Sequence, residues 1–173
     1  MKVSLFLIGS LLCLLTGCAR KEATSPIVAG SSVFGVFEGI TPCSAETQPL
    51  PQIPEDTNCE QMIWEFALFQ DSATGAPTIY RLDAAYGVPK QNTTGLDRGG
   101  TLITMEGNWA IVKGTSADPD AVVYQLHPDD SQQITSFLKV DDNHLFLLDR
   151  ELNALVGNAL FSYTLSRTDK DVK

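Results

Sequence analysis

The sequence predicts an all-β fold, an antiparallel sandwich or barrel, from three observations. Short stretches rich in β-branched and aromatic residues recur at close spacing along the chain. Glycine, proline, asparagine and aspartate separate these stretches, and these are the residues that form turns. Long segments with the 3.6-residue period of an amphipathic helix are missing from the sequence. Regularly spaced short strands of this kind are typical of antiparallel sandwiches and barrels.

The first half of the chain supplies the clearest strand patterns. The segment 34–40 is short, apolar and bounded by glycine, and the segment 62–70 alternates between apolar and polar positions. Glu65 falls on the polar face of this second strand. The opposite face carries the apolar side chains Met62, Trp64, Phe66 and Leu68. A turn over 71–77, with Ser, Gly and Pro, then leads into a strand over 78–82.

The remaining strands follow in short steps, and from Ala121 onward they are predicted to form a meander of hairpins. They are expected at 101–105, 108–112, 122–126, 134–140, 144–148 and 160–165. The turns between them are expected at Glu106-Gly107, Lys113-Gly114, Pro128-Asp129-Asp130 and Asp141-Asp142-Asn143.

A short apolar segment that ends at a cysteine opens the chain. Lys2 precedes the nearly uncharged run Val3–Leu15, which is too short for a transmembrane helix and fits the apolar region of a secretory signal. The sequence Leu15-Thr16-Gly17-Cys18 resembles the lipobox of bacterial lipoproteins, in which the chain is cut before the cysteine and the cysteine is lipidated. We therefore predict a lipoprotein signal peptide over 1–17 and lipidation of Cys18. The alternative is an ordinary signal peptide with a chance cysteine.

The lipobox implies a location as well as a modification. A diacylglycerol and an amide-linked acyl chain on Cys18 would anchor the protein stably, because stable anchoring takes more than one chain. Ala19, rather than aspartate, follows the cysteine, which by analogy with enteric bacteria favours the outer membrane, facing the periplasm. We expect a small-residue tether over 18–32, one domain over 33–167 and a polar tail over 168–173.

The acidic charge of the chain excludes several partners. The net charge is −9, and loss of the signal peptide with Lys2 leaves 11 Lys and Arg residues against 21 Asp and Glu. Nucleic acid and anionic lipid headgroups are therefore poor partners for the domain. The carboxylates cluster at turn positions such as Asp129-Asp130 and Asp141-Asp142, and the spacing of a calcium loop is missing.

The cysteine count predicts one disulfide bond. Cys13 lies in the predicted signal peptide and Cys18 is assigned to the lipid, so Cys43 and Cys59 remain as a pair. Outside the inner membrane the envelope is oxidising, and two remaining cysteines there usually join. A thiol pair for redox or metal chemistry is the alternative, but these cysteines lack close spacing and a nearby cation that would lower a thiol pKa.

Four segments together resemble the N-terminal domain of the NlpE-type outer-membrane lipoproteins, a family of copper-resistance and surface-sensing proteins. Phe37–Cys43 resembles the family's aromatic-x-Gly-x-x-Pro-Cys opening, and Gly107–Trp109 resembles its Gly-Thr-Trp strand. Leu145–Asn153 and Phe161–Leu165 resemble its Leu-Asp-Arg-Glu-Gly-Asn turn and terminal strand. The resemblance implies a small antiparallel β-barrel or meander, lipocalin-like in architecture, that contacts an inner-membrane sensor kinase or another envelope protein.

One departure from the family bears on copper. The family's opening continues as Cys-x-x-Cys, whereas Glu46 stands here where the second cysteine would be. Copper prefers thiolate, thioether and imidazole ligands. The two histidines, His127 and His144, lie far apart in sequence, and Met62 has the spacing of a core residue. We expect no metal site and no cofactor, and the residues disfavour direct copper binding.

Motifs for catalysis are missing as well. The sequence contains no Gly-x-Ser-x-Gly, no His-Glu-x-x-His and no phosphate-binding glycine loop before a helix, so we predict that the protein is not an enzyme. Two functions remain. The first is an envelope adaptor that acts by protein contact in stress or surface sensing or in copper homeostasis. The second is a lipocalin-like carrier of a small apolar ligand, which needs an internal cavity.

Overall fold

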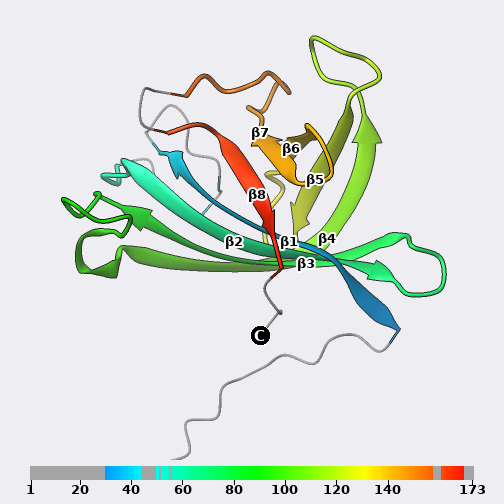
Figure 1. Cartoon of the computed structure of the whole chain (residues 1–173), viewed down its shortest axis with the longest axis horizontal. Coiled ribbons are helices and arrows are strands. Elements are labelled where there is room, and N and C mark those ends of the chain that lie inside the picture. Colours follow the sequence, from blue (N-terminus) through cyan, green and yellow to red (C-terminus); the bar gives the residue numbers. More distant parts are fainter. Residues whose placement is uncertain (1–29, 44–49, 51, 55, 158–160, 170–173) are drawn as a thin grey trace, which may run out of the picture.

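The computed structural model describes residues 30–43, 50, 52–54, 56–157 and 161–169, which form a closed barrel of antiparallel strands (Figure 1). Each strand pairs with the next along the chain, and the last pairs back with the first. The strands are β1 (Ser31–Pro42), β2 (Gln61–Asp71), β3 (Pro77–Gly87), β4 (Thr101–Lys113), β5 (Val122–Pro128), β6 (Thr135–Lys139), β7 (His144–Leu147) and β8 (Thr164–Thr168). The all-β prediction is confirmed, and of its two alternatives the barrel is right.

The positions of the strands agree with the prediction except at β1, β3, β4 and β8. Residues 101–113 form the single strand β4, so the turn expected at Glu106-Gly107 is wrong. Strand β3 continues to Gly87, and β8 covers Thr164–Thr168 rather than 160–165. The barrel begins at Ser31, so the last two residues of the expected tether belong to the sheet. A short 3₁₀ turn, η1 (Asp97–Gly99), lies in the loop before β4.

Gly107 has a packing role rather than a turn role. A Cβ atom at this position would collide with the backbone carbonyl oxygen of His127 on the neighbouring strand β5. Glycine inside a strand marks a close approach of two backbones, and β4 and β5 make such an approach here. In the sequence, Gly107 therefore looks like a turn residue although it lies inside a strand.

Side chains from all eight strands fill the interior of the barrel. The predicted inward face of β2 is confirmed, because Met62, Trp64, Phe66 and Leu68 are at most 1% exposed. Aromatic rings from opposite walls meet in the centre: the Phe66 ring lies 5.1 Å from that of Phe137, which lies edge-on to Trp64 at 5.9 Å. Packed aromatic pairs of this kind contribute beyond the area that they bury.

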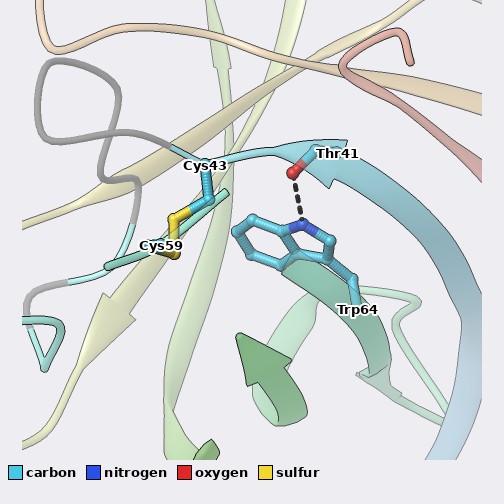
Figure 2. The surroundings of a disulfide bond; sticks show 4 residues. All are labelled: Thr41, Cys43, Cys59 and Trp64. Atoms are coloured by element: carbon cyan, nitrogen blue, oxygen red, sulfur yellow. Dashed lines mark hydrogen bonds between the residues drawn. A yellow bond between two sulfur atoms is a disulfide. The ribbon is translucent and has the colours of Figure 1, made fainter. Parts of the chain in front are cut away.

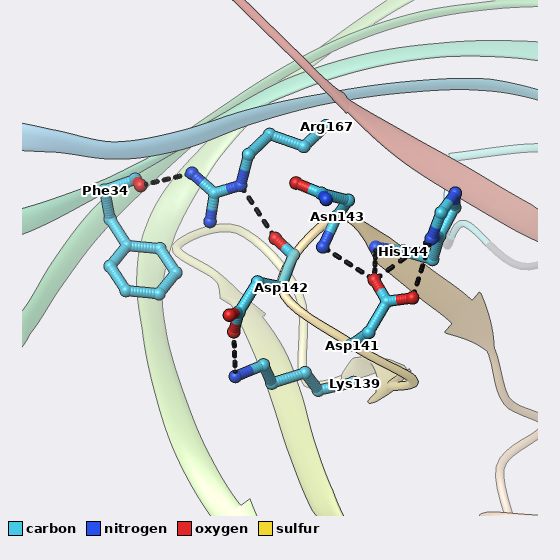
Figure 3. A network of polar contacts seen from close by, with 7 residues as sticks. All are labelled: Phe34, Lys139, Asp141, Asp142, Asn143, His144 and Arg167. Carbon is cyan, nitrogen blue, oxygen red and sulfur yellow. Dashed lines mark hydrogen bonds and ion pairs between the residues drawn. The ribbon is translucent and has the colours of Figure 1, made fainter.

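The β1–β8 pairing closes the barrel with few backbone contacts. Three residue pairs join the two strands, from Val36 opposite Thr168 to Glu38 opposite Ser166. Arg167 reinforces this seam. Its Nη1 donates to the carbonyl oxygen of Phe34 at 2.8 Å, and its Nε donates to that of Asp142 at 2.9 Å (Figure 3).

The Arg167 guanidinium also lies over two aromatic rings. The guanidinium carbon is 5.5 Å from the ring centre of Phe34 and 5.0 Å from that of Phe37. A Cβ atom at Gly35 would collide with this guanidinium, so a glycine in β1 leaves the space for it. One side chain thus connects β8, β1 and the β6–β7 turn.

Among the described residues, no helix has the length and apolar character needed to cross a membrane.

Candidate functional site

The structure brings together two of the three predicted site residues. Cys43 and Cys59 form a disulfide bond with their Cα atoms 5.2 Å apart, and both are buried (Figure 2). The indole of Trp64 lies beside this bond and donates from Nε1 to Oγ1 of Thr41 at 2.9 Å. The bridge fixes the end of β1 to the start of β2, which is a structural role. Cys18, the predicted lipidation site, lies outside the described residues, as does Glu46.

Metal ligands are not clustered in the part of the chain that the structure describes, where no group of three or more His, Cys, Asp or Glu side chains could hold an ion. His127 lies within β5, and His144 begins β7. The His144 ring contacts the Asp141 carboxylate at 2.9 Å in the β6–β7 turn (Figure 3). The sulfur atoms of Cys43 and Cys59 are bonded to each other and so are not thiolate ligands.

One candidate site is a groove of about 650 Å³ on the outer face of the barrel. Its lining comes from β8, β1, β2, β3 and the start of β4. Trp64 and Phe66 face the interior, so Glu65 between them faces outward, as alternation along a strand requires. The same alternation turns Glu38 and Asp83 toward the groove.

Three carboxylates lie side by side along this groove, and we call them the acidic row: Glu38, Glu65 and Asp83. Glu38 is directly opposite Glu65, and Glu65 is directly opposite Asp83. Directly opposite Cβ atoms are about 5 Å apart in antiparallel sheets, so these three acidic side chains are neighbours on the outer face. The Asp83 carboxylate accepts a hydrogen bond of 2.8 Å from Oγ1 of Thr104.

An apolar row runs parallel to the acidic row, two residues away from it on β1, β2 and β3. It consists of Ile40, Ile63, Ala85 and Leu102, each directly opposite the next. Leu102 is 79% exposed, while the other three are half-buried. Among the described lining residues Arg167 is the one cation, and its guanidinium donates to Phe34 and Asp142. The groove therefore presents an apolar surface with carboxylates along one side.

A second groove, of about 500 Å³, lies on the outer face of β5 and β6. Amide side chains dominate its lining: Gln125, Gln132 and Gln133. Arg150 reaches over it and donates from Nη2 to Oε1 of Gln133 at 3.4 Å. This groove combines these hydrogen-bonding groups with the apolar side chains of Ile134 and Leu152.

The described residues hold one strongly perturbed ionisable group in the interior. Burial, with smaller contributions from Asp130 and Asp129, raises the pKa of Tyr80 far above its ordinary value. Its hydroxyl is buried without a hydrogen-bond partner. A phenol with a raised pKa stays protonated at physiological pH, so Tyr80 does not supply a base.

The acidic row was not among the residues singled out from the sequence. Alternation could have placed each carboxylate on the outer face of its own strand, but the row depends on the register between three strands. The comparisons add no family: no family model matches the chain, and neither a curated protein nor a solved structure matches it. The barrel and its outer grooves are therefore the basis for a functional proposal.

Proposed function

We propose that the protein is a lipid-anchored outer-membrane protein of the bacterial envelope, similar to the NlpE type, that acts by protein contact. Its role would lie in envelope stress or surface sensing, or in copper homeostasis, with an inner-membrane sensor kinase or another envelope protein as partner. The observation that carries this proposal is the cluster of buried side chains inside the barrel, to which all eight strands contribute among the described residues.

The packing of the interior supports contact with proteins over transport of a small ligand. A carrier barrel needs an internal cavity, and an eight-stranded barrel is either filled by its own side chains or holds one small ligand. Here the central rings of Phe37, Phe66 and Phe137 are at most 1% exposed and pack on one another. The grooves described above lie on the outer face instead.

The copper part of this role would act through a partner rather than through a copper site in the described residues. Copper prefers thiolate, thioether and imidazole ligands. The Cys43 and Cys59 sulfurs are bonded to each other, and Met62 is fully buried in the core. His127 and His144 lie on different strands, and His144 contacts Asp141.

The test compares the full chain with a variant that lacks the lipid attachment. Wild type and Cys18→Ala would be overexpressed in a bacterium that carries an envelope-stress reporter. We expect wild type to raise the reporter several-fold, with a different response from Cys18→Ala because its location changes. No response to wild type at a confirmed protein level would contradict the proposal.

The carrier alternative is tested on the same purified chain. Native mass spectrometry of the full-length protein would detect a co-purified apolar ligand as an added mass. We expect the mass of the lipidated chain alone. A stoichiometric small molecule in the spectrum would favour the carrier over the contact role.

A further inference from the structure

The first part of β4 is an open edge of the sheet. Strand β5 pairs with β4 only from Gly107 to Lys113, and one further hydrogen bond runs from the amide of Asp129 to the carbonyl oxygen of Glu106. Residues 101–105 pair with β3 on one side, and no strand of the described part of the chain lies on their other side. We call residues 101–105 the β4 edge.

The alternation of the backbone shows which groups face the open side. In an antiparallel sheet the N–H and C=O of one residue point to the same side of the strand, and those of the next residue point to the opposite side. Glu106 accepts a bond on the β5 side, so the backbone groups of Thr104 and Leu102 also point to that side. These groups bond to no other described residue there, and both residues are exposed.

The β4 edge lacks the features that usually protect an open edge. Lysine, proline, a β-bulge or a covering segment protects such an edge, because unpaired backbone groups recruit further strands. The edge has the sequence Thr-Leu-Ile-Thr-Met, without charge or proline, and its register with β3 is unbroken. The edge of β1 next to the seam is different, since Arg167 donates to the carbonyl oxygen of Phe34 there.

The open backbone groups define the shape of a ligand. Leu102 and Thr104 present their N–H and C=O groups about 7 Å apart, which is the repeat of an extended backbone. The ligand would span about five residues or 17 Å, because Asp129 already occupies the position opposite Glu106. A residue added beside Leu102 would cover a side chain that is 79% exposed, so an apolar or β-branched residue fits that position.

We propose that the β4 edge binds an extended segment of another envelope protein, which adds to β4 as an antiparallel strand. This inference rests on the proposed contact role and names how the partner is held. Main-chain hydrogen bonds supply the affinity in such strand addition, and alternate side chains supply the specificity. A second copy of this chain fits less well, because each copy carries a net charge of −9.

The first test measures amide hydrogen exchange of the full-length chain in detergent, without any ligand. The amides of Leu102 and Thr104 should exchange about tenfold faster than those of Ile103 and Met105, which face β3. Equal protection of all four amides would overturn the inference, because the edge would then be covered already.

A defined probe then tests strand addition. The probe is a synthetic seven-residue peptide of alternating valine and threonine with a lysine at each end. The matched peptide carries N-methyl groups on its five central amides, which removes donors from both of its edges. The probe should slow exchange at Leu102 and Thr104 about tenfold and leave Ile103 and Met105 unchanged, and the N-methylated peptide should have no effect. An effect of both peptides, or of neither, would overturn the inference.

Matched variants place the binding at the β4 edge. Thr104→Pro removes an N–H that faces the open side, and proline is tolerated at such edge positions because the ladder with β3 keeps its bonds. Thr104→Val loses the same hydroxyl, which donates to Asp83, but keeps the N–H. The proline variant should lose about tenfold in affinity for the probe, and the valine variant less than about twofold. Equal affinity of the two variants would overturn the inference, and the N-methylated peptide decides the question if the proline variant does not fold.

Crosslinking in cells identifies the occupant. A photo-crosslinking residue replaces Leu102 in the full-length chain, and the control replaces Val156, which is 92% exposed elsewhere. The expected adduct joins position 102 to another envelope protein, disappears with Thr104→Pro and persists with Thr104→Val. An adduct to a second copy of the chain, an adduct of equal yield in both variants, or no adduct would overturn the inference.

The same variants separate this inference from the proposed function. If wild type does not activate the envelope-stress reporter, the proposed function fails, and the probe still decides whether the edge accepts a strand. If wild type and Thr104→Pro activate the reporter equally at equal protein level, the function stands and strand addition at β4 is wrong. A response reduced in Thr104→Pro but not in Thr104→Val supports both.

Discussion

The two halves of the barrel differ in how their strands are held. Strands β1 to β4 have 11 to 13 residues each and pair along nearly their full lengths. Strands β5 to β8 have 4 to 7 residues, and the β6–β7 and β7–β8 pairings each join three residue pairs (Figure 1). Long backbone ladders hold the first half, whereas the ladders of the second half are short.

Polar side chains in the turns stabilise the half of the barrel formed by β5 to β8, where the backbone pairings are short. Asp141 accepts hydrogen bonds from the backbone of Asn143 and His144, and Asp149 accepts them from Glu151 and Asn153. Lys139 contacts the Asp142 carboxylate at 2.7 Å across the same β6–β7 turn (Figure 3). Aspartate at a turn start bonds to backbone amides in this way and so fixes the turn.

Most of the outer groove lies on the long half, and the β1–β8 closure of the barrel forms its edge. The long half carries the acidic and apolar rows and has the disulfide at one end. The short half closes the barrel, and the Arg167 side chain connects it to β1. Because Glu38, Ser166, Arg167 and Thr168 of the seam also line the groove, we expect substitutions at the seam to affect both the stability and this edge of the groove.

Loss of the disulfide bond should have the largest effect. The bridge closes a loop with a sequence separation of 16, which contributes about 3 kcal/mol in the chain-entropy model. Cys43→Ala/Cys59→Ala should lower the free energy of unfolding in urea by about that amount. The untouched chain should gain the mass of two hydrogens on reduction after unfolding. A loss below about 1 kcal/mol would show that the ladder of the long half holds this end without the bridge.

Loss of Arg167 at the β1–β8 seam should have the second-largest effect on stability. Arg167→Met removes two charged hydrogen bonds and keeps an unbranched side chain, so we expect a loss of about 2–3 kcal/mol. Hydrogen exchange should accelerate first at the amides of 36–38 and 166–168, where the seam opens locally. Arg150→Met, at an exposed position, is the control and should change neither quantity. Uniform acceleration throughout the barrel would contradict a local role for Arg167.

The smallest effect is a pH dependence in the β6–β7 turn. The hydrogen bond and charge of Lys139 hold the pKa of Asp142 below its usual value, and the bond to Asp142 raises the pKa of Lys139. The stabilisation from Asp142 is therefore present above its ordinary pKa of about 4 and is lost as the pH falls through the lowered value. The stabilisation from Lys139 is present below the ordinary lysine pKa of about 10.4 and is lost as the pH rises through the raised pKa.

The variant Asp142→Asn tests the pH range over which this ion pair stabilises the protein. Its unfolding midpoint in urea should lie slightly below that of wild type at neutral pH, and the difference should vanish in acid. Asp120→Asn, in the exposed loop between β4 and β5, serves as the control. A difference that persists unchanged below the lowered pKa would show that the ion pair is not its cause.

Most of the fold could be predicted from local patterns. The inward face of β2 was evident because alternation is a property of neighbouring residues along one strand. The disulfide followed from the assignment of the other two cysteines and is present in the structure. The single strand β4 could not be predicted, because a glycine that a neighbouring backbone approaches looks the same in sequence as a glycine in a turn.

The sequence by itself determined the strands, most of their turns and the pair of cysteines, since these depend on residue type and short spacing. Only the tertiary structure decided that the sheet closes, that Glu38, Glu65 and Asp83 form one row, and that Arg167 meets Phe34. The physical reason is distance along the chain. Arg167 and Phe34 are 133 residues apart, and the acidic row needs the register of three strands to agree. A shift by one residue would turn each carboxylate to the other face.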